Sequence, residues 1–141
     1  QARERKELRL ESMEFVKKLY DNNIPRICIE NPVGFLNSNW KKPDQIIHPY
    51  HFGDTESKRT CLWLKNLQPL KHTNVVKPKI YGYHKGGKHK GQPIYFHEYQ
   101  LRTKDRAKIR SKFWKGIAKA MANQWMKLGR DRGCKCNKRN G

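Results

Sequence analysis

The chain has 141 residues, enough for one domain with a hydrophobic core and too few for two domains of ordinary size. It carries 32 Lys and Arg against 12 Asp and Glu, a net charge of +20, which exceeds what solubility requires and predicts a polyanionic partner. No apolar run approaches the roughly 20 residues that span a bilayer, and the chain opens with charged residues. We therefore expect a soluble, cytoplasmic protein with no transmembrane segment.

The positive charge is concentrated in the second half of the chain. Residues 1–70 hold 12 basic and 9 acidic side chains, a net of +3, whereas residues 71–141 hold 20 basic and 3 acidic ones, a net of +17. This asymmetry predicts a folded scaffold followed by a nucleic-acid-binding surface. We expect one domain over residues 1–129 and a flexible basic tail over 130–141, where apolar periodicity is missing.

The first predicted elements are a helix and a strand. Residues 2–21 form an amphipathic pattern of helical period, and Asn22-Asn23 would end the helix. The short apolar run at 26–30 then predicts a buried strand, and such helix-then-strand units build parallel sheets. The apolar positions assigned to the buried side of the helix are Leu8, Phe15, Val16, Leu19 and Tyr20.

Two further extended segments follow. Residues 43–49 form a short extended piece between prolines, and residues 59–65 form the second strongly strand-like run. Between them, residues 54–57 (Asp-Thr-Glu-Ser) resemble a helix-capping sequence and predict a single helical turn.

The second half contains a predicted hairpin and a predicted helix. Residues 80–84 and 94–98 would be the hairpin strands, joined by a loop rich in glycine and lysine over 85–91. Helical spacing returns from Thr103 onward, and Gly129 would end that helix.

Glu30-Asn31-Pro32 closes the first predicted strand and is the sharpest candidate site. In open α/β sheets ligands bind beyond the carboxyl ends of the strands, and a carboxylate held there can hydrogen-bond the ring nitrogen and exocyclic amine of a flipped base. The alternative is a structural role, in which Glu30 caps a neighbouring backbone group or pairs with a lysine.

The segment from Lys77 to Lys119 is a candidate nucleic-acid surface, with 13 Lys and Arg, 2 acids and interleaved aromatic residues. Basic side chains neutralise phosphates and aromatic rings stack on unpaired bases. Each aromatic could equally belong to a buried face of the hairpin. The predicted contact residues are Lys85, Lys88, Lys90, Arg102, Arg106, Lys108, Arg110 and Lys112.

The cysteines and histidines give no metal-binding pattern. Cys134-Lys135-Cys136 lacks the second pair of ligands that a structural zinc site needs, so we predict no metal. Cys28 and Cys61 lie inside apolar strand-like runs, where burial is expected to raise the pKa of a thiol and suppress its reactivity.

Four segments in order resemble consecutive blocks of the cytosine-specific (cytosine-5) DNA methyltransferase-like proteins of phages and prophages. They are IENPVG (29–34), KPDQIIHPYHFGD (42–54), TCLWLKNLQPL (60–70) and KIRSKFWKGIAKAMANQW (108–125). The resemblance implies a bacterial or phage-infected cell, DNA rather than RNA as partner, and S-adenosylmethionine as cofactor of the complete enzyme.

The resemblance also implies residue roles. Glu30 and Asn31 match the first two residues of the Glu-Asn-Val segment whose glutamate grips the flipped cytosine, with Pro32 in place of valine. Gly116 belongs to a helix resembling the terminal block that folds back beside the cofactor site.

The sequence departs from the family pattern at its start. It lacks the glycine-bearing turn that holds the cofactor and the Pro-Cys segment that supplies the nucleophile, and Cys28 and Cys61 match neither. Either the chain is part of a complete enzyme, which its first residue, glutamine, favours, or it is a remnant with another task. Methyl transfer would then need an N-terminal partner segment.

These observations predict an α/β fold, the C-terminal part of a Rossmann-like methyltransferase fold with an added basic β-hairpin and a C-terminal helix. The leading functional hypothesis is the base-gripping and DNA-contacting part of a cytosine-5 DNA methyltransferase. The alternative is a catalytically inactive nucleic-acid-binding protein, for DNA or RNA, within a larger nucleoprotein assembly. Membrane-surface attachment is the weakest option, because it needs a basic amphipathic helix with bulky apolar anchors and the helix at 113–128 is too alanine-rich.

Overall fold

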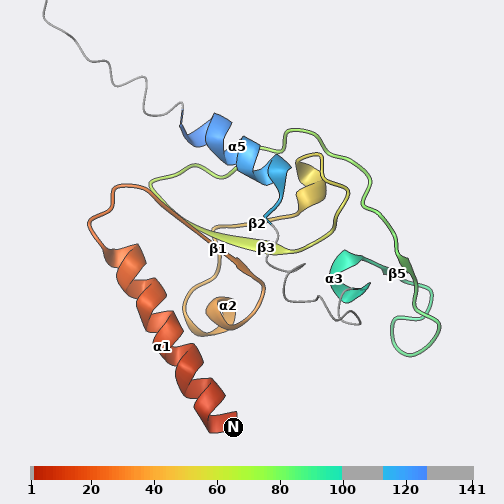
Figure 1. The fold of residues 1–141 in the computed structure, drawn as a ribbon, viewed down its shortest axis with the longest axis horizontal. Coiled ribbons are helices and arrows are strands. Elements are labelled where there is room, and N and C mark those ends of the chain that lie inside the picture. The colour runs from red at the N-terminus through yellow and green to blue at the C-terminus, as the bar shows by residue number, and fades with distance from the viewer. Residues whose placement is uncertain (1, 100–112, 127–141) are drawn as a thin grey trace, which may run out of the picture.

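The computed structural model describes residues 2–99 and 113–126 and shows a mixed α/β fold (Figure 1). Its helices and strands, in chain order, are α1 (Ala2–Asp21), β1 (Ile27–Pro32), α2 (Phe35–Asn39), β2 (Gln45–Ile47), the 3-10 helix η1 (Pro49–His51), β3 (Thr60–Lys65), β4 (Gly82–Tyr83), β5 (Pro93–Ile94), α3 (Phe96–Tyr99) and α5 (Lys115–Trp125). None of the helices in the described part is both long and apolar enough to cross a membrane.

A three-stranded sheet in the order β1-β3-β2 forms the centre of the fold. Both β1 and β2 pair antiparallel with β3, so β1 and β2 run parallel to each other on either side of it. The expected parallel pairing of neighbouring strands is therefore not what the structure has, and the described residues show no doubly wound sheet. The physical reason is that β3 returns in the opposite direction and inserts between the two parallel strands.

The central position of β3 follows from its composition. Residues Thr60 to Leu64 are all buried, because helices cover both faces of the sheet at this strand. A strand enclosed in this way reads as a continuous apolar run rather than an alternating one. Its neighbours, β1 and β2, have partly exposed residues, as expected for strands with an open edge.

Alternate side chains of β3 pack into two separate hydrophobic cores, one on each face of the sheet. Figure 1 shows α5 on one side of the sheet and α1 with α2 on the other. The α1-side core consists of Met13, Leu36, Cys61 and Trp63. The α5-side core consists of Ile47, Phe52, Leu62, Leu64, Leu70, Trp114, Ile117 and Ala120.

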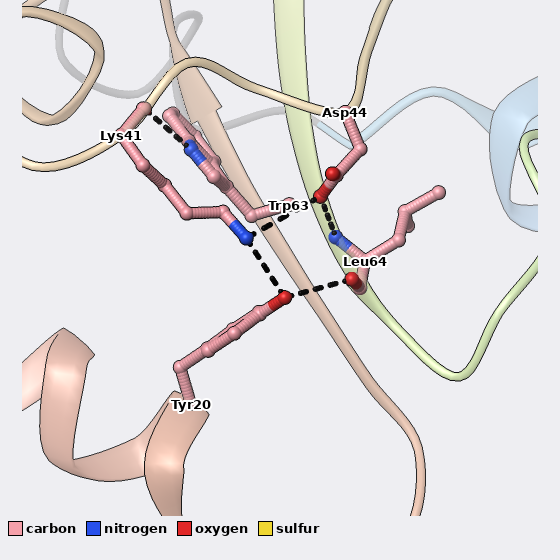
Figure 2. A network of polar contacts seen from close by, with 5 residues as sticks. All are labelled: Tyr20, Lys41, Asp44, Trp63 and Leu64. Carbon is pink, nitrogen blue, oxygen red and sulfur yellow. Dashed lines mark hydrogen bonds and ion pairs between the residues drawn. The ribbon is translucent and has the colours of Figure 1, made fainter.

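A polar network fixes α1 and the 41–44 segment to β3 (Figure 2). Tyr20 Oη donates a hydrogen bond to the Leu64 carbonyl oxygen and accepts one from Lys41 Nζ, both at 2.9 Å. The Trp63 indole N–H donates to the Lys41 carbonyl oxygen at 2.9 Å, and the Leu64 N–H donates to Asp44 Oδ2 at 2.7 Å. These bonds satisfy polar groups beside the buried strand and set the register of α1 against it.

The helix over residues 2–21 is confirmed, but its packing face differs from the expected one. Met13 is buried, and Val16 and Tyr20 pack partly against the α1-side core, a spacing of three and four residues. Val16 and Tyr20 belong to the expected buried face, so that expectation is confirmed in part, but its other members, Leu8, Phe15 and Leu19, are exposed. Two apolar stripes fit the helical period, and only the tertiary packing selects between them.

Several segment boundaries also differ from the expectation. The single turn expected at 54–57 is not helical, and the helical turn lies earlier, at η1. The hairpin is confirmed in a shorter form, because β4 pairs with β5 while Phe96–Tyr99 turns into α3 instead of extending the second strand. The helix expected from Thr103 begins at Lys115 within the described residues, while residues 103–112 and Gly129 lie outside them.

Candidate functional site

Glu30 lies inside β1 rather than at its end. The strand continues through Asn31 and Pro32, which pair with Cys61 and Thr60 of β3. The side chain of Glu30 is exposed, and its carboxylate accepts no hydrogen bond from any residue within 2–99 or 113–126. The described residues therefore contain no backbone group that Glu30 caps and no lysine that pairs with it.

The backbone of Glu30 faces the outer edge of the sheet. Proline lacks an N–H and is accommodated in a strand where its nitrogen points away from the neighbouring strand, so Pro32 faces outward opposite Thr60. Glu30 lies two residues earlier and points the same way. The hydrogen bonds of β3 agree with this direction. The Leu62 carbonyl and the Leu64 N–H are both bonded to Asp44 on the β2 side, so the backbone groups of Leu62 point away from Glu30, its partner on β1. Glu30 thus offers both its carboxylate and its peptide groups at an open edge.

Glu30 and Asn31 do not act on the same face. Successive side chains of a strand point to opposite faces, so Glu30 shares the α5 side with Cys28 and Leu62, whereas Asn31 shares the α1 side with Ile29. Asn31 is partly buried. The side chains of Glu30 and Asn31 therefore lie on opposite faces of the sheet, and of the two, Glu30 is the exposed one.

The two cysteines near Glu30 are held as neutral thiols. Burial, reinforced by the negative charge of Glu30, raises the pKa of Cys28 to about 11. Burial also raises the pKa of Cys61, which lies in the α1-side core on the opposite face of the sheet. The expected suppression of both thiols is confirmed, and neither has the electropositive, accessible surroundings of a nucleophilic cysteine.

Gly116 lies at the start of α5, where the helix meets the segment after η1. Its N–H donates to Asp54 Oδ2 at 2.9 Å, so an acidic side chain satisfies one of the free N–H groups at this helix end. A Cβ atom at Gly116 would collide with the carbonyl group of Phe52 and crowd the Asp54 carboxylate. This glycine allows α5 to approach the sheet, and its expected role beside a cofactor stays a prediction.

The basic loop between β4 and β5 carries the first three predicted contact residues. Lys85, Lys88 and Lys90 are all exposed there. The base of the loop is closed by backbone hydrogen bonds from His84 N–H to the Gln92 carbonyl at 3.0 Å and from Gly91 N–H to the His84 carbonyl at 2.9 Å. Gly91, with φ of 82°, adopts a backbone conformation that other residues rarely take, so the turn needs a glycine there. The lysines therefore lie on a closed hairpin, whose loop follows β4 and precedes β5 in Figure 1.

The aromatic residues around the hairpin divide into structural and exposed ones. Tyr81 stacks on Tyr99 with ring centroids 4.9 Å apart, and its hydroxyl donates to Glu56 at 2.9 Å. Burial, helped by Glu56, raises the pKa of Tyr81 to about 12. Trp114 belongs to the α5-side core. Tyr83 is different, because 59% of its surface is exposed.

The remaining predicted contact residues lie outside the described residues, as does the tail at 130–141. These contact residues are Arg102, Arg106, Lys108, Arg110 and Lys112. Their proposed role depends on sequence alone.

No family model, curated protein or solved structure matches the chain. The functional proposal therefore rests on the geometry of this chain's own residues. Within the described ranges that geometry offers a free carboxylate at a sheet edge and a basic hairpin with an exposed tyrosine.

A cluster of histidine rings beside η1 was not anticipated from the sequence. His51 stacks on His72 with centroids 4.0 Å apart, and the His48 ring lies 5.3 Å from that of His51. Burial, together with the charges of His51 and Arg59, lowers the pKa of His48 to about 4, and burial beside His72 lowers the pKa of His51. Within the described residues, no group of three or more His, Cys, Asp or Glu side chains is arranged to hold a metal ion.

Proposed function

We propose that this chain is the C-terminal, base-gripping and DNA-contacting part of a cytosine-5 DNA methyltransferase-like protein, built on part of a Rossmann-like methyltransferase fold. The observation that carries the proposal is the exposed carboxylate of Glu30 on the edge strand β1, within the Glu-Asn-Pro segment, which accepts no hydrogen bond from the described residues. Helices on both faces of the central sheet are compatible with this assignment, although β1 and β2 are separated by β3, which pairs antiparallel with both.

The proposed task of Glu30 is recognition of an extruded cytosine. A carboxylate can accept hydrogen bonds from the exocyclic amine and from a protonated ring nitrogen, and it thereby favours the protonated ring that nucleophilic attack requires. The exposed position of Glu30 leaves both carboxylate oxygens available for this contact. Asn31, which points to the other face, would position the strand rather than touch the base.

The nucleophile has to come from a completing segment. Cys28 and Cys61 are held protonated by burial and by the Glu30 charge, so a thiolate at either position is disfavoured at neutral pH. S-adenosylmethionine would supply the methyl group in the completed enzyme. Around Gly116, the N–H of the glycine is bonded to Asp54 and the Phe52 carbonyl lies where a Cβ atom would stand, so the backbone of this residue is occupied by contacts within the fold.

The open edge of β1 provides a place for such a segment. Strand β1 pairs only with β3 among the described strands, and the backbone groups of Cys28 and Glu30 point outward. An unpaired strand edge accepts a further strand through main-chain hydrogen bonds. A completing strand that paired there would bring its own end next to Glu30.

DNA contact is assigned to the basic second half. Lys85, Lys88 and Lys90 offer three exposed positive charges on one loop, which suits neutralisation of phosphates and release of their counterions. Arg102, Arg106, Lys108, Arg110 and Lys112 extend the same proposal beyond the described residues.

A reconstitution experiment tests the enzymatic part. The purified chain is mixed with a separately expressed N-terminal segment of a phage cytosine methyltransferase-like protein, cytosine-containing duplex DNA and methyl-labelled S-adenosylmethionine. The proposal expects label in DNA only with both segments, and loss of that label in Glu30→Gln. Absence of transfer from the pair would oppose the enzymatic proposal.

The second candidate function is a catalytically inactive nucleic-acid-binding protein of a nucleoprotein assembly. It is favoured by the burial of Cys61 and the partial burial of Cys28, which raises the pKa of both thiols and disfavours the thiolate that a nucleophile needs. This candidate predicts salt-dependent binding to DNA or RNA that Glu30→Gln leaves unchanged, whereas base gripping predicts a selective loss of cytosine recognition.

A further inference from the structure

Tyr83 is an exposed aromatic residue at the entrance to the basic hairpin loop. It ends β4, pairs with Pro93 of β5 and leaves 59% of its surface open to solvent. Its neighbour Tyr81, two residues earlier, is occupied by stacking on Tyr99 and by its hydrogen bond to Glu56. The hairpin therefore has one tyrosine that holds it to the domain and one whose ring is accessible.

The charged residues near Tyr83 in the sequence are almost all positive. Glu98 is the single acid between residues 77 and 99, and its carboxylate is bonded to His84 Nε2 at 2.9 Å. Lys85, Lys88 and Lys90 follow Tyr83 on the loop, where each is exposed. Glu56, a carboxylate that contacts the hairpin from outside it, is bonded to the Tyr81 hydroxyl, so both nearby carboxylates are engaged while the loop lysines are exposed to a ligand.

The hairpin displays this group on a fixed backbone. Gln92 and Gly91 bond back to His84 across the base of the loop, and the Tyr81 N–H donates to the Ile94 carbonyl at 2.9 Å. Tyr83 lies between these two cross-links. Little backbone order has to be gained when a ligand binds, which favours affinity.

We propose that Tyr83 stacks on an unpaired or extruded base while the loop lysines hold the flanking phosphates. A base inside a duplex is already stacked on its neighbours, so an exposed ring gains most from a base that has left the stack. This inference rests on the proposed nucleic-acid contact of the loop and specifies its target as nucleic acid with at least one unpaired base.

The test compares three fluorescent probes of equal length by anisotropy: a duplex, the same duplex with a one-nucleotide bulge, and the single strand. Stacking on an aromatic side chain contributes about 1–3 kcal/mol per base, so Tyr83→Ala should weaken binding of the bulged and single-stranded probes by roughly 5- to 150-fold. Duplex binding should change less than about twofold. Tyr83→Phe keeps the ring and should bind like the wild type.

Two controls separate the outcomes. Phe15→Ala removes another exposed aromatic, on α1 and outside the basic segment, and should leave all three affinities unchanged. Replacing Lys85, Lys88 and Lys90 together by Gln should weaken all probes and lower the salt dependence of binding. If the lysine variant has no effect, the proposed DNA contact of the loop fails. If it acts but Tyr83→Ala affects all probes equally or none, the stacking inference alone is overturned.

Discussion

The carboxylate of Asp54 accepts a hydrogen bond from the N–H of Gly116 at 2.9 Å, linking two segments 62 residues apart in the sequence. The bond joins the loop after η1 to the first turn of α5, whose residues Ile117 and Ala120 are buried against the sheet. An acidic side chain at this helix end is also favoured by the helix dipole. The contact makes α5 part of the layer that covers the face of the sheet on which Glu30 lies.

Gly116→Ala should destabilise the fold. The added methyl group would collide with the backbone carbonyl of Phe52, so α5 or the loop has to move. Overpacking of this kind typically costs about 1–3 kcal/mol in the free energy of unfolding, measurable by urea denaturation. Gly86→Ala is the matched control, because its added methyl group would meet nothing within 4 Å. Equal stability of the two variants would contradict the close approach at Gly116.

The histidine cluster should make the protein acid-sensitive. The pKa of His48 is about 4 in the folded chain, below the ordinary 6.5, and that of His51 is also lowered. The unfolded chain therefore binds protons first as the pH falls, and stability decreases from about pH 6.5 toward pH 4. Thermal unfolding at several pH values measures this, and His48→Gln should flatten the curve in that window. A melting temperature that stays constant from pH 7 to pH 5 would rule out this linkage.

Cys28 should react slowly with alkylating reagents. Its pKa of about 11 leaves very little thiolate at pH 7.5, and Cys61 is buried as well. The measurement uses a Cys134→Ser/Cys136→Ser variant, so that only these two thiols are counted with iodoacetamide and mass spectrometry. Labelling should be slow in the folded protein and complete after denaturation. Rapid stoichiometric labelling at pH 7.5 would show that an accessible thiolate exists and would contradict the conclusion that neither cysteine can act as the nucleophile.

Local patterns predicted the strongest elements well. The run around Cys61 to Leu64 predicted β3 because a strand enclosed on both faces is continuously apolar, and the charge pattern of residues 2–21 predicted α1. The turn glycines around Gly87 and Gly91 predicted the hairpin, because both adopt left-handed backbone conformations.

Features that depend on tertiary contacts were not predictable. Strand order is set by which segments meet in space, so the insertion of β3 between β1 and β2 had no local signal. The same holds for Met13, selected over Phe15 by packing against the sheet. The stacking of His51 on His72 joins residues far apart in sequence whose spacing matches no motif.

The candidate site was predicted in part. The place of Glu30 after an apolar run singles it out, but the strand was expected to end at this residue, whereas an edge strand accepts a proline and β1 continues to Pro32. Tyr83 could not be separated from Tyr81 by sequence, because alternation places both on one face of a strand. Only the contacts of Tyr81 with Tyr99 and Glu56 distinguish them.

The role of Glu30 is tested most directly by base discrimination. The affinities of the wild type and of Glu30→Gln are measured for DNA duplexes that differ in one unpaired base, cytosine or thymine. The wild type should prefer cytosine, and Glu30→Gln should lose that preference while it keeps its salt-dependent affinity, because the exposed side chain contributes to no described fold contact. Equal binding of cytosine and thymine by the wild type, or an unchanged preference in Glu30→Gln, would contradict base gripping by this strand.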